Sequence, residues 1–217
     1  WADIRAVDVV EKLGCFSFDP VLLGERLPRI HMSMVGHHNM MNAMFALGLA
    51  HVAEADLAGA CEGISNFGGV RRRYDVHEGP AGGVLVNDYA HHPAEIEAVV
   101  AASRCRFPGR RLLVVFQPHQ YQRTLLLLDA FAIALASADV TLVAEIYGAR
   151  ETDEIMASVS AGDLVNGVRE QGSESHYAGP VDGLAESVAK HRREGDVVMV
   201  LGAGNIDTAV ADIVAGL

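Results

Sequence analysis

Apolar residues after position 72 follow two alternating patterns. Short runs of consecutive apolar residues alternate with longer segments in which apolar residues recur every three or four positions. The runs are typical of parallel strands buried on both faces, and the spacing is typical of amphipathic helices. The strands are expected at 84–86, 112–116, 140–146 and 197–201, and the helices near 93–103, 123–137, 160–171, 182–191 and 206–217. The order predicts an α/β fold with a mostly parallel, Rossmann-like sheet.

The first part of the chain has a different pattern. Residues up to about 30 mix short apolar pieces with turn signals, which indicates strands and loops. Residues 30–35 alternate like a half-buried strand, and two helices are expected, from about 37 to 52 and from 56 to 64. Phe67-Gly68-Gly69 then breaks the pattern before three arginines. We therefore predict two domains, residues 1–72 and residues 73–217.

Composition limits the functional classes. Half of the 217 residues are apolar, and the formal net charge of −11 argues against a general nucleic-acid surface. No apolar run reaches the roughly 18 residues of a membrane span, and the sequence contains no charged-then-apolar leader, so neither a span nor a signal peptide is expected. Cys15, Cys61 and Cys105 are few and widely spaced, as expected for reduced thiols. The sequence favours a soluble cytoplasmic protein that binds neither nucleic acid nor membranes.

Polar clusters follow two of the predicted strands. Residues 87–93 follow the first strand, and residues 117–124 follow the second. Ligands of open α/β sheets bind at the carboxyl ends of the strands, so these two neighbouring strand ends are expected to form one crevice. Arg123 could hold a carboxylate or phosphate there through two parallel hydrogen bonds. The side chains expected in this crevice are Asp88, Tyr89, His91, His92, His119, Tyr121 and Arg123.

Other readings of the chain remain open. Gly202-Ala203-Gly204 after a strand resembles the start of a dinucleotide fingerprint, so an NAD-dependent oxidoreductase is one alternative, although the third glycine is missing. A non-catalytic Rossmann-like binding module is another. The histidines lack the spacing of a zinc site, so no protein-bound metal is expected, and no G-x-S-x-G hydrolase motif occurs. Neither lysine follows a glycine, so the phosphate loop of many ATPases is also absent.

Four motifs in order resemble the Mur ligase family. They are Gly36-His37-His38-Asn39-Met40-Met41-Asn42-Ala43, Phe67-Gly68-Gly69-Val70-Arg71-Arg72-Arg73-Tyr74, Asn87-Asp88-Tyr89-Ala90-His91-His92-Pro93-Ala94-Glu95 and Phe116-Gln117-Pro118-His119-Gln120-Tyr121-Gln122-Arg123-Thr124. The form Gln-Pro-His-x-Tyr-x-Arg-Thr points to members that join L-alanine to UDP-N-acetylmuramate. The resemblance implies an ATP-dependent ligase of peptidoglycan synthesis that uses Mg²⁺ and forms a C–N bond through an acyl phosphate.

The resemblance also implies that the chain is part of a larger enzyme. Such ligases have three domains, and residues 1–72 would be the tail of the central ATP-binding domain, with residues 73–217 as the carboxyl-terminal domain. The chain begins at Trp1 without a methionine, which favours a fragment. Its partners would be the amino-terminal and central portions of the same enzyme. Because the phosphate loop is absent, this chain alone is expected to have no ligase activity.

The resemblance implies a role for individual residues. Asn39 and Asn42, which are three apart and share one helical face, would lie near the adenine. Arg73 would lie near the ATP phosphates and Asp88 on the ribose. The incoming alanine and the carboxylate of the sugar nucleotide would face Tyr89, His91, His119 and Arg123. His91 and Arg123 are the expected catalytic residues. Two positions depart from the family pattern: Asn87 replaces a frequent acid and Gln120 a frequent arginine.

Overall fold

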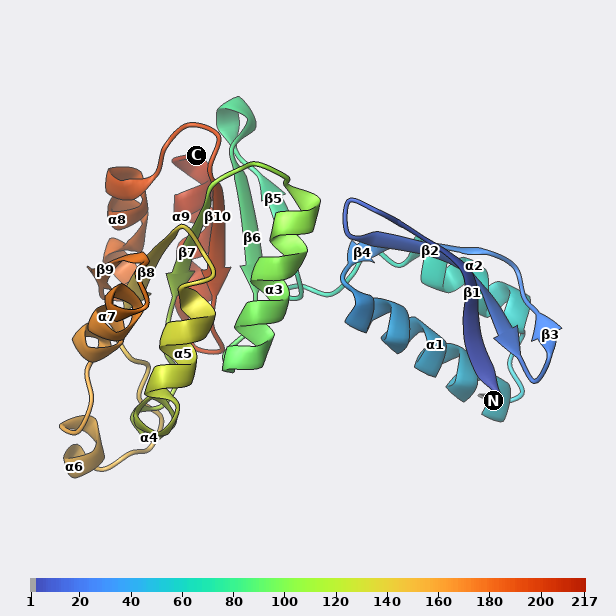
Figure 1. Ribbon diagram of the computed structural model, residues 1–217, viewed down its shortest axis with the longest axis horizontal. Helices are drawn as coiled ribbons and strands as arrows, with labels where there is room; N and C mark the ends of the chain where they lie inside the picture. Colours follow the sequence, from blue (N-terminus) through green and yellow to red (C-terminus); the bar gives the residue numbers. More distant parts are fainter. Residues whose placement is uncertain (1–2) are drawn as a thin grey trace. The chain divides into compact units, whose positions relative to one another are not determined.

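The computed structural model describes residues 3–217, apart from the side chain of Ala81. The chain divides into two compact units, and the division falls between Gly69 and Val70 (Figure 1). The predicted domain boundary lay three residues later, after Arg72.

The first unit is an antiparallel sheet packed against two helices. Strand β2 pairs with β1, β3 and β4. The elements are β1 (Ile4–Lys12), β2 (Cys15–Leu22), β3 (Glu25–Arg26), β4 (Ile30–Val35), α1 (His37–Val52) and α2 (Leu57–Asn66). Phe18, Ile30, Leu47 and Cys61 form the centre of its core. The strand predicted at 30–35 and both predicted helices are confirmed, and Asp56 caps α2 by accepting a hydrogen bond from the Ala58 N–H.

The second unit is a six-stranded sheet in the order β5-β6-β10-β7-β8-β9. Strand β5 runs antiparallel to β6, and the remaining neighbours are parallel. The strands are β5 (Asp75–Glu78), β6 (Val84–Asp88), β7 (Leu112–Phe116), β8 (Val140–Ala144), β9 (Glu174–Gly179) and β10 (Val197–Leu201). The predicted α/β fold with a mostly parallel sheet is confirmed.

Helices cover both faces of this sheet (Figure 1). One face packs against α3 (Pro93–Arg106), α5 (Leu128–Leu135) and α7 (Ala161–Glu170). The other packs against α8 (Leu184–His191) and α9 (Val210–Ala215). Side chains of β10 alternate between the two cores, because successive strand residues point to opposite faces. The short elements are η1 (Pro80–Gly82), α4 (Tyr121–Leu126), α6 (Asp153–Met156), η2 (Val181–Gly183) and η3 (Ile206–Ala209).

Three features of the second unit differ from the sequence predictions. The edge strands β5 and β9 were not predicted, because they are short, polar and partly exposed. The helix expected at 123–137 is two helices, α4 and α5, which meet at Leu127. The helix expected at 206–217 begins as the 3-10 helix η3. The break at Leu127 and the tighter 3-10 turns of η3 leave the spacing of apolar residues almost unchanged. The apolar pattern therefore revealed neither the break nor the 3-10 helix.

None of the helices in residues 3–217 is long and apolar enough to cross a membrane.

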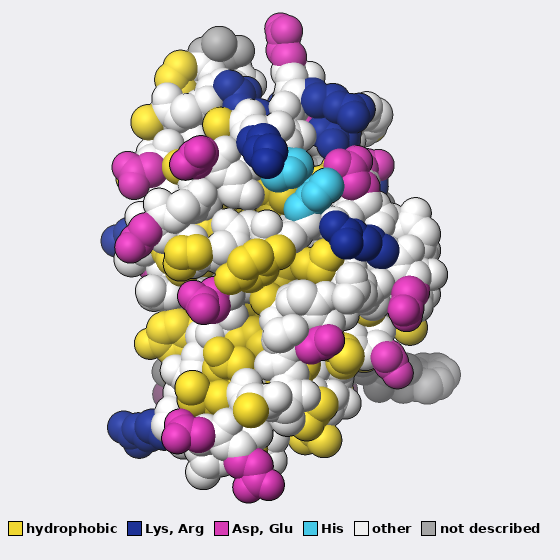
Figure 2. Space-filling view, turned by 90° about the vertical axis from the view of Figure 1, so that its left-hand side faces the viewer, with side chains coloured by type: hydrophobic (Ala, Val, Ile, Leu, Met, Phe, Trp, Pro, Cys, Tyr) yellow, Lys and Arg dark blue, Asp and Glu magenta, His cyan; other side chains and the backbone are white. Residues whose placement is uncertain are grey.

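One face of the molecule is shown in Figure 2, where acidic side chains are scattered among apolar ones. Basic side chains gather toward one end of that face.

Candidate functional site

The carboxyl ends of β6, β10 and β7 form the middle of one sheet edge. The prediction that the β6 and β7 ends are neighbours is wrong, because β10 lies between them and pairs with both. Strand β10 is the last in sequence, and a long-range insertion of this kind leaves no local signal. The loops that follow β6 and β7 nevertheless meet, since the ring centroids of His91 and His119 are 6.5 Å apart. The two polar loops therefore come together across three strands.

Asp88 is the last residue of β6, and its carboxylate is buried. One oxygen accepts a hydrogen bond from the Tyr74 N–H at 2.7 Å, and the other accepts one from the Ala90 N–H at 2.7 Å. Only 6% of the residue is exposed. Burial raises the pKa of the Asp88 carboxyl, although the two N–H groups and the nearby Arg73 oppose this effect. Asp88 therefore ties the start of the second unit to the end of β6.

The turn from β6 into α3 holds His91 in one orientation. Pro93 is the first residue of α3, as predicted, and Glu95 accepts hydrogen bonds from the N–H groups of His91 (2.9 Å) and His92 (3.1 Å). The His91 Nδ1 lies 3.0 Å from the carbonyl oxygen of Tyr89. A carbonyl can only accept, so Nδ1 carries the proton and Nε2 is the acceptor of the neutral ring.

Two buried nitrogen atoms near the end of β7 have no hydrogen-bond partner among residues 3–217. They are Nδ1 of His119 and Nη1 of Arg123, which belongs to the first turn of α4. The His119 ring stacks on Tyr147, with centroids 5.4 Å apart. Burial lowers the pKa of His119, and the positive charge of Arg123 and the nearby His91 lower it further. Buried polar atoms are normally paired, so these two indicate a place for a ligand.

The segment at the start of the second unit has a strained backbone. Arg72 and Tyr74 both adopt left-handed conformations, with φ of 60° and 53°. The Arg72 guanidinium donates to the carbonyl oxygens of Gly202 (2.6 Å) and Gly204 (3.2 Å) and pairs with Asp207. Strain in non-glycine residues persists only where the surroundings hold it, and here these bonds do so.

Arg73 lies between the two strained residues and is exposed. Its guanidinium lies 5.6 Å from the centroid of the Tyr89 ring, and that of Arg72 lies 4.9 Å from the same ring. Tyr89 in turn contacts His91 edge to face at 5.3 Å. A continuous series of side chains therefore runs from Arg73 to His119.

The Gly202-Ala203-Gly204 loop packs tightly against protein side chains. A Cβ atom at Gly204 would lie 2.5 Å from Oε1 of Gln117 and 2.9 Å from Cγ of Tyr147. Gln117 also crosses the loop, donating to Asn205 Oδ1 (2.9 Å) and accepting from the Ile206 N–H (3.1 Å). Close packing explains the glycine at 204, so the oxidoreductase alternative gains no support from it.

We expect Gly204→Ala to lower the free energy of unfolding by about 1–3 kcal/mol, because the added methyl group overlaps Gln117 and Tyr147. Urea unfolding measures this effect. Gly183→Ala is the matched control, since a Cβ there meets nothing within 4 Å and φ is −96°. Equal stability of the two variants would contradict the packing explanation.

Asn39 and Asn42 belong to the first unit. Asn39 donates to the carbonyl oxygen of Val35 at 2.8 Å, and Asn42 donates to Oδ1 of Asn39 at 3.5 Å. The two side chains share one face of α1, as their spacing predicts. Gly36 occupies the capping position with φ of 97°, so capping does not account for Asn39.

Comparison with known proteins places these motifs in a family. The family model described as "Mur ligase, glutamate ligase domain" matches residues 72–204. The chain belongs to the Mur ligase family. It is 37% identical over 206 residues to the UDP-N-acetylmuramate–L-alanine ligase of Caldanaerobacter subterraneus subsp. tengcongensis, covering 94% of this chain and 44% of that protein. The corresponding enzyme of Salinibacter ruber is 38% identical over 207 residues, covering 94% and 43%.

Solved structures of Mur ligases share this fold. The UDP-N-acetylmuramate–alanine ligase of Thermotoga maritima superimposes with a TM-score of 0.78 at 24% identity, covering 98% of this chain and 45% of that one. The MurF ligase of Thermotoga maritima, solved in complex with ADP, gives a TM-score of 0.65 at 16% identity, covering 97% and 46%. The chain thus spans less than half the length of the Mur ligases that it matches.

Two residues of this Mur ligase chain that the sequence did not single out belong to the loop after β8. Tyr147 stacks on His119, and Glu151 accepts hydrogen bonds from the start of α4. The signal in the sequence that could have revealed them is their position, since both are polar residues that follow a third predicted strand, β8. Among the predicted crevice residues, His92 is exposed and lies at the start of α3, where its N–H donates to Glu95 and its carbonyl oxygen accepts from the N–H groups of Glu95 and Ile96.

The described residues of this Mur ligase chain contain no group of three or more His, Cys, Asp or Glu side chains that could hold a metal ion. Its three cysteines are all free thiols; Cys61 is buried, Cys15 half-buried and Cys105 exposed.

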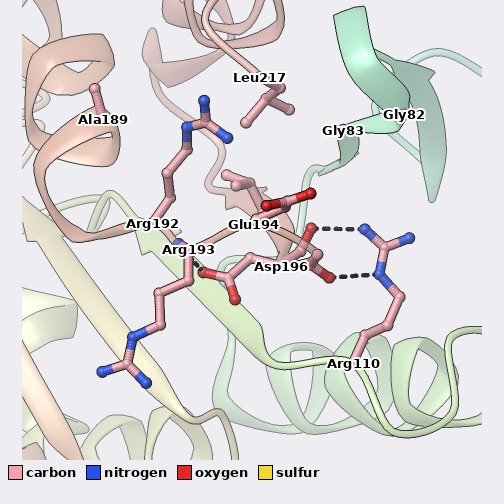
Figure 3. Close-up of a pocket in the computed structure, with 11 residues that line it drawn as sticks. Gly82, Gly83, Arg110, Ala189, Arg192, Arg193, Glu194, Asp196 and Leu217 are labelled. Atoms are coloured by element: carbon pink, nitrogen blue, oxygen red, sulfur yellow. Dashed lines mark hydrogen bonds between the residues drawn. The ribbon is translucent and has the colours of Figure 1, made fainter.

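A cavity of about 600 Å³ lies at the opposite edge of the sheet, where β6, β7 and β10 begin (Figure 3). Arg110 lines it and donates to the carbonyl oxygens of Gly195 (2.6 Å) and Asp196 (2.8 Å). No residue of the predicted crevice lines this cavity. Ligands of open parallel sheets bind at the carboxyl ends of the strands, which is the edge opposite this cavity.

Proposed function

We propose that this chain is a portion of an ATP-dependent, cytoplasmic ligase that joins L-alanine to UDP-N-acetylmuramate in peptidoglycan precursor synthesis. The observation that carries the proposal is the pair of unpartnered buried nitrogens, His119 Nδ1 and Arg123 Nη1, beside His91 and Tyr89. The proposal is supported by 37–38% identity over 94% of the chain to enzymes of that name.

Arg123 would bind the carboxylate of L-alanine. A guanidinium fixes a carboxylate by two parallel hydrogen bonds, and Nη1 of Arg123 is a buried donor that needs an acceptor. Burial lowers the pKa of His119, with help from the charges of Arg123 and His91. His119 is then neutral at pH 7, and its Nδ1 is free to bind a substrate atom.

His91 would take a proton from the amine. The ammonium of an amino acid must lose a proton before it can act as a nucleophile. The proton on Nδ1 of His91 is held toward the Tyr89 carbonyl, so Nε2 presents a lone pair. Tyr89 lies against both the His91 ring and the Arg73 guanidinium, and so would join the alanine and phosphate ends of the site.

Polar residues of the second unit would contact the nucleotide. Arg73 is exposed and suits the ATP phosphates, and Asp88 would contact the ribose. The adenine role of Asn39 and Asn42, in the first unit, stays a prediction from the family resemblance. Both oxygens of Asp88 already accept backbone N–H groups, so a ribose hydroxyl would share one of them. Bound Mg²⁺ would neutralise phosphate charge; the described residues hold no cluster of ligands for it, so its ligands would be phosphates and residues outside this chain.

The proposed reaction explains why positively charged side chains are needed at the carboxyl ends of the strands. The muramoyl carboxylate attacks the γ-phosphate of ATP, giving ADP and an acyl phosphate. The amine of alanine then attacks the acyl carbon, and the C–O bond to phosphate breaks to leave an amide and inorganic phosphate. Both steps develop negative charge on oxygen, which guanidinium groups in a water-poor site stabilise.

A chimeric ligase tests the proposal. The part of the Caldanaerobacter subterraneus ligase that this chain matches is replaced by this chain, and phosphate release is assayed with ATP, Mg²⁺, UDP-N-acetylmuramate and L-alanine. We expect release that depends on L-alanine, and none from the 217-residue chain alone. A folded chimera that binds ATP but releases no phosphate, beside an active parent enzyme, would favour the non-catalytic Rossmann-like module.

A further inference from the structure

The loop after β8, residues 145–151, runs along the segment that carries His119 and Arg123. The Tyr147 N–H donates to the carbonyl oxygen of Pro118, and the Tyr147 carbonyl accepts from the Gln120 N–H, both at 2.8 Å. The Tyr147 ring stacks on His119. Gly148 lies so close to Tyr121 that a Cβ atom would be 3.2 Å from its ring. The loop therefore supports the entire β7–α4 connection.

The start of α4 depends on this loop for its cap. Gln120 occupies the capping position with φ of 73°, and its side chain makes no capping hydrogen bond. The first N–H groups of a helix have no partner within the helix. In α4, the carboxylate of Glu151 accepts hydrogen bonds from the first two of these N–H groups. Oε2 accepts from the Tyr121 N–H at 2.9 Å, and Oε1 accepts from the Gln122 N–H at 2.8 Å.

We propose that Glu151 is a positioning residue for Arg123 and His119, and that through them it sets the affinity of the site for the amino-acid substrate. This inference rests on the proposed function. Arg123 is the third residue of α4 and lies in the turn that Glu151 caps. A six-residue helix is marginal by itself, so its first turn depends on tertiary contacts.

The charge of Glu151 acts on the same site. Burial pushes the pKa of Glu151 upward, but hydrogen bonds from the N–H groups of Gln122, Tyr121 and Ala149 outweigh burial and hold that pKa below its usual value. Glu151 is therefore ionised at neutral pH. Its charge raises the pKa of His119, against the burial and the charges of Arg123 and His91 that lower it.

Kinetics of the chimeric ligase test the inference. We expect Glu151→Ala to raise KM for L-alanine about tenfold or more while kcat changes by less than about threefold, since a displaced Arg123 binds the carboxylate less well. Glu151→Gln keeps one acceptor oxygen and should give a smaller rise. Glu154→Gln, at an exposed position on α6, removes the same charge and should leave KM unchanged. An unchanged KM in Glu151→Ala would overturn the inference.

A second measurement needs no catalysis. The pKa of His119 is followed by NMR in the 217-residue chain, where Glu151→Gln is expected to lower it and Glu154→Gln to leave it unchanged. A purely structural role of Glu151 would change stability without this shift, so an unchanged His119 pKa in folded Glu151→Gln would count against the inference. An inactive chimera together with the expected NMR shift would reject the ligase function but not the contact of Glu151 with this site.

Discussion

Arg123→Ala is expected to reduce kcat/KM of the chimeric ligase for L-alanine by about 10²–10³-fold, the loss typical of a half-buried charged group that binds an opposite charge. Nη1 of Arg123 is buried without a hydrogen-bond partner in the part of the chain that the structure describes, so a ligand carboxylate would be its main interaction. Steady-state phosphate release at varied L-alanine measures the effect.

Two further variants make the Arg123 prediction specific. Arg123→Lys keeps the charge but loses the planar pair of donors, so it should recover only part of the activity. Arg193→Ala removes an exposed arginine beside the cavity at the opposite sheet edge and should leave kcat/KM within about twofold of the parent value. Similar losses in Arg123→Ala and Arg193→Ala would mean that general charge, and not the crevice, explains the result.

The apolar pattern predicted the central strands of the second unit, which are buried on both faces of the sheet. Strands β7 and β10 are continuous apolar runs, and β6 and β8 are mostly apolar, so all four strands were predicted. Strand β9 is half-exposed and polar, and its pairing with β8 is a long-range contact that local sequence does not encode. The position of β10 between β6 and β7 is also a property of the whole sheet.

Side chains next to a strand end were predictable, and contacts across the sheet were not. The polar clusters after β6 and β7 led to the prediction that His91, His119 and Arg123 are site residues, and the structure brings the rings of His91 and His119 within 6.5 Å of each other. Glu151 lies 28 residues after Arg123 and carries no motif of its own, so only the folded chain reveals that it caps α4. The assignment of Asn39, Arg73 and Asp88 to the nucleotide remains a prediction.

Asp88→Ala is expected to lower the free energy of unfolding of the second unit by about 2–4 kcal/mol, because two N–H groups, of Tyr74 and Ala90, lose their acceptor. Urea unfolding measures the loss. Asp163→Ala is the matched control: Asp163 accepts hydrogen bonds from Ser160 at an exposed helix start, where removal of a cap contact typically costs about 0.5–1 kcal/mol. An equal loss of unfolding free energy in the two variants would show that the burial of Asp88 does not increase the cost of losing its hydrogen bonds.

The pH dependence of stability separates the burial of Asp88 from its hydrogen bonds. Burial raises its pKa in the folded state above the usual 3.8, so the native state binds the proton more tightly than the unfolded state. The stabilisation from this proton is fully present below the unfolded pKa and is lost as pH rises through the folded pKa. Unfolding of the parent chain and of Asp88→Asn, which does not titrate, is compared at pH 7 and near pH 4. The parent should gain stability relative to the variant as pH falls. A relative loss would mean that the two N–H groups outweigh burial and that the pKa is lowered instead.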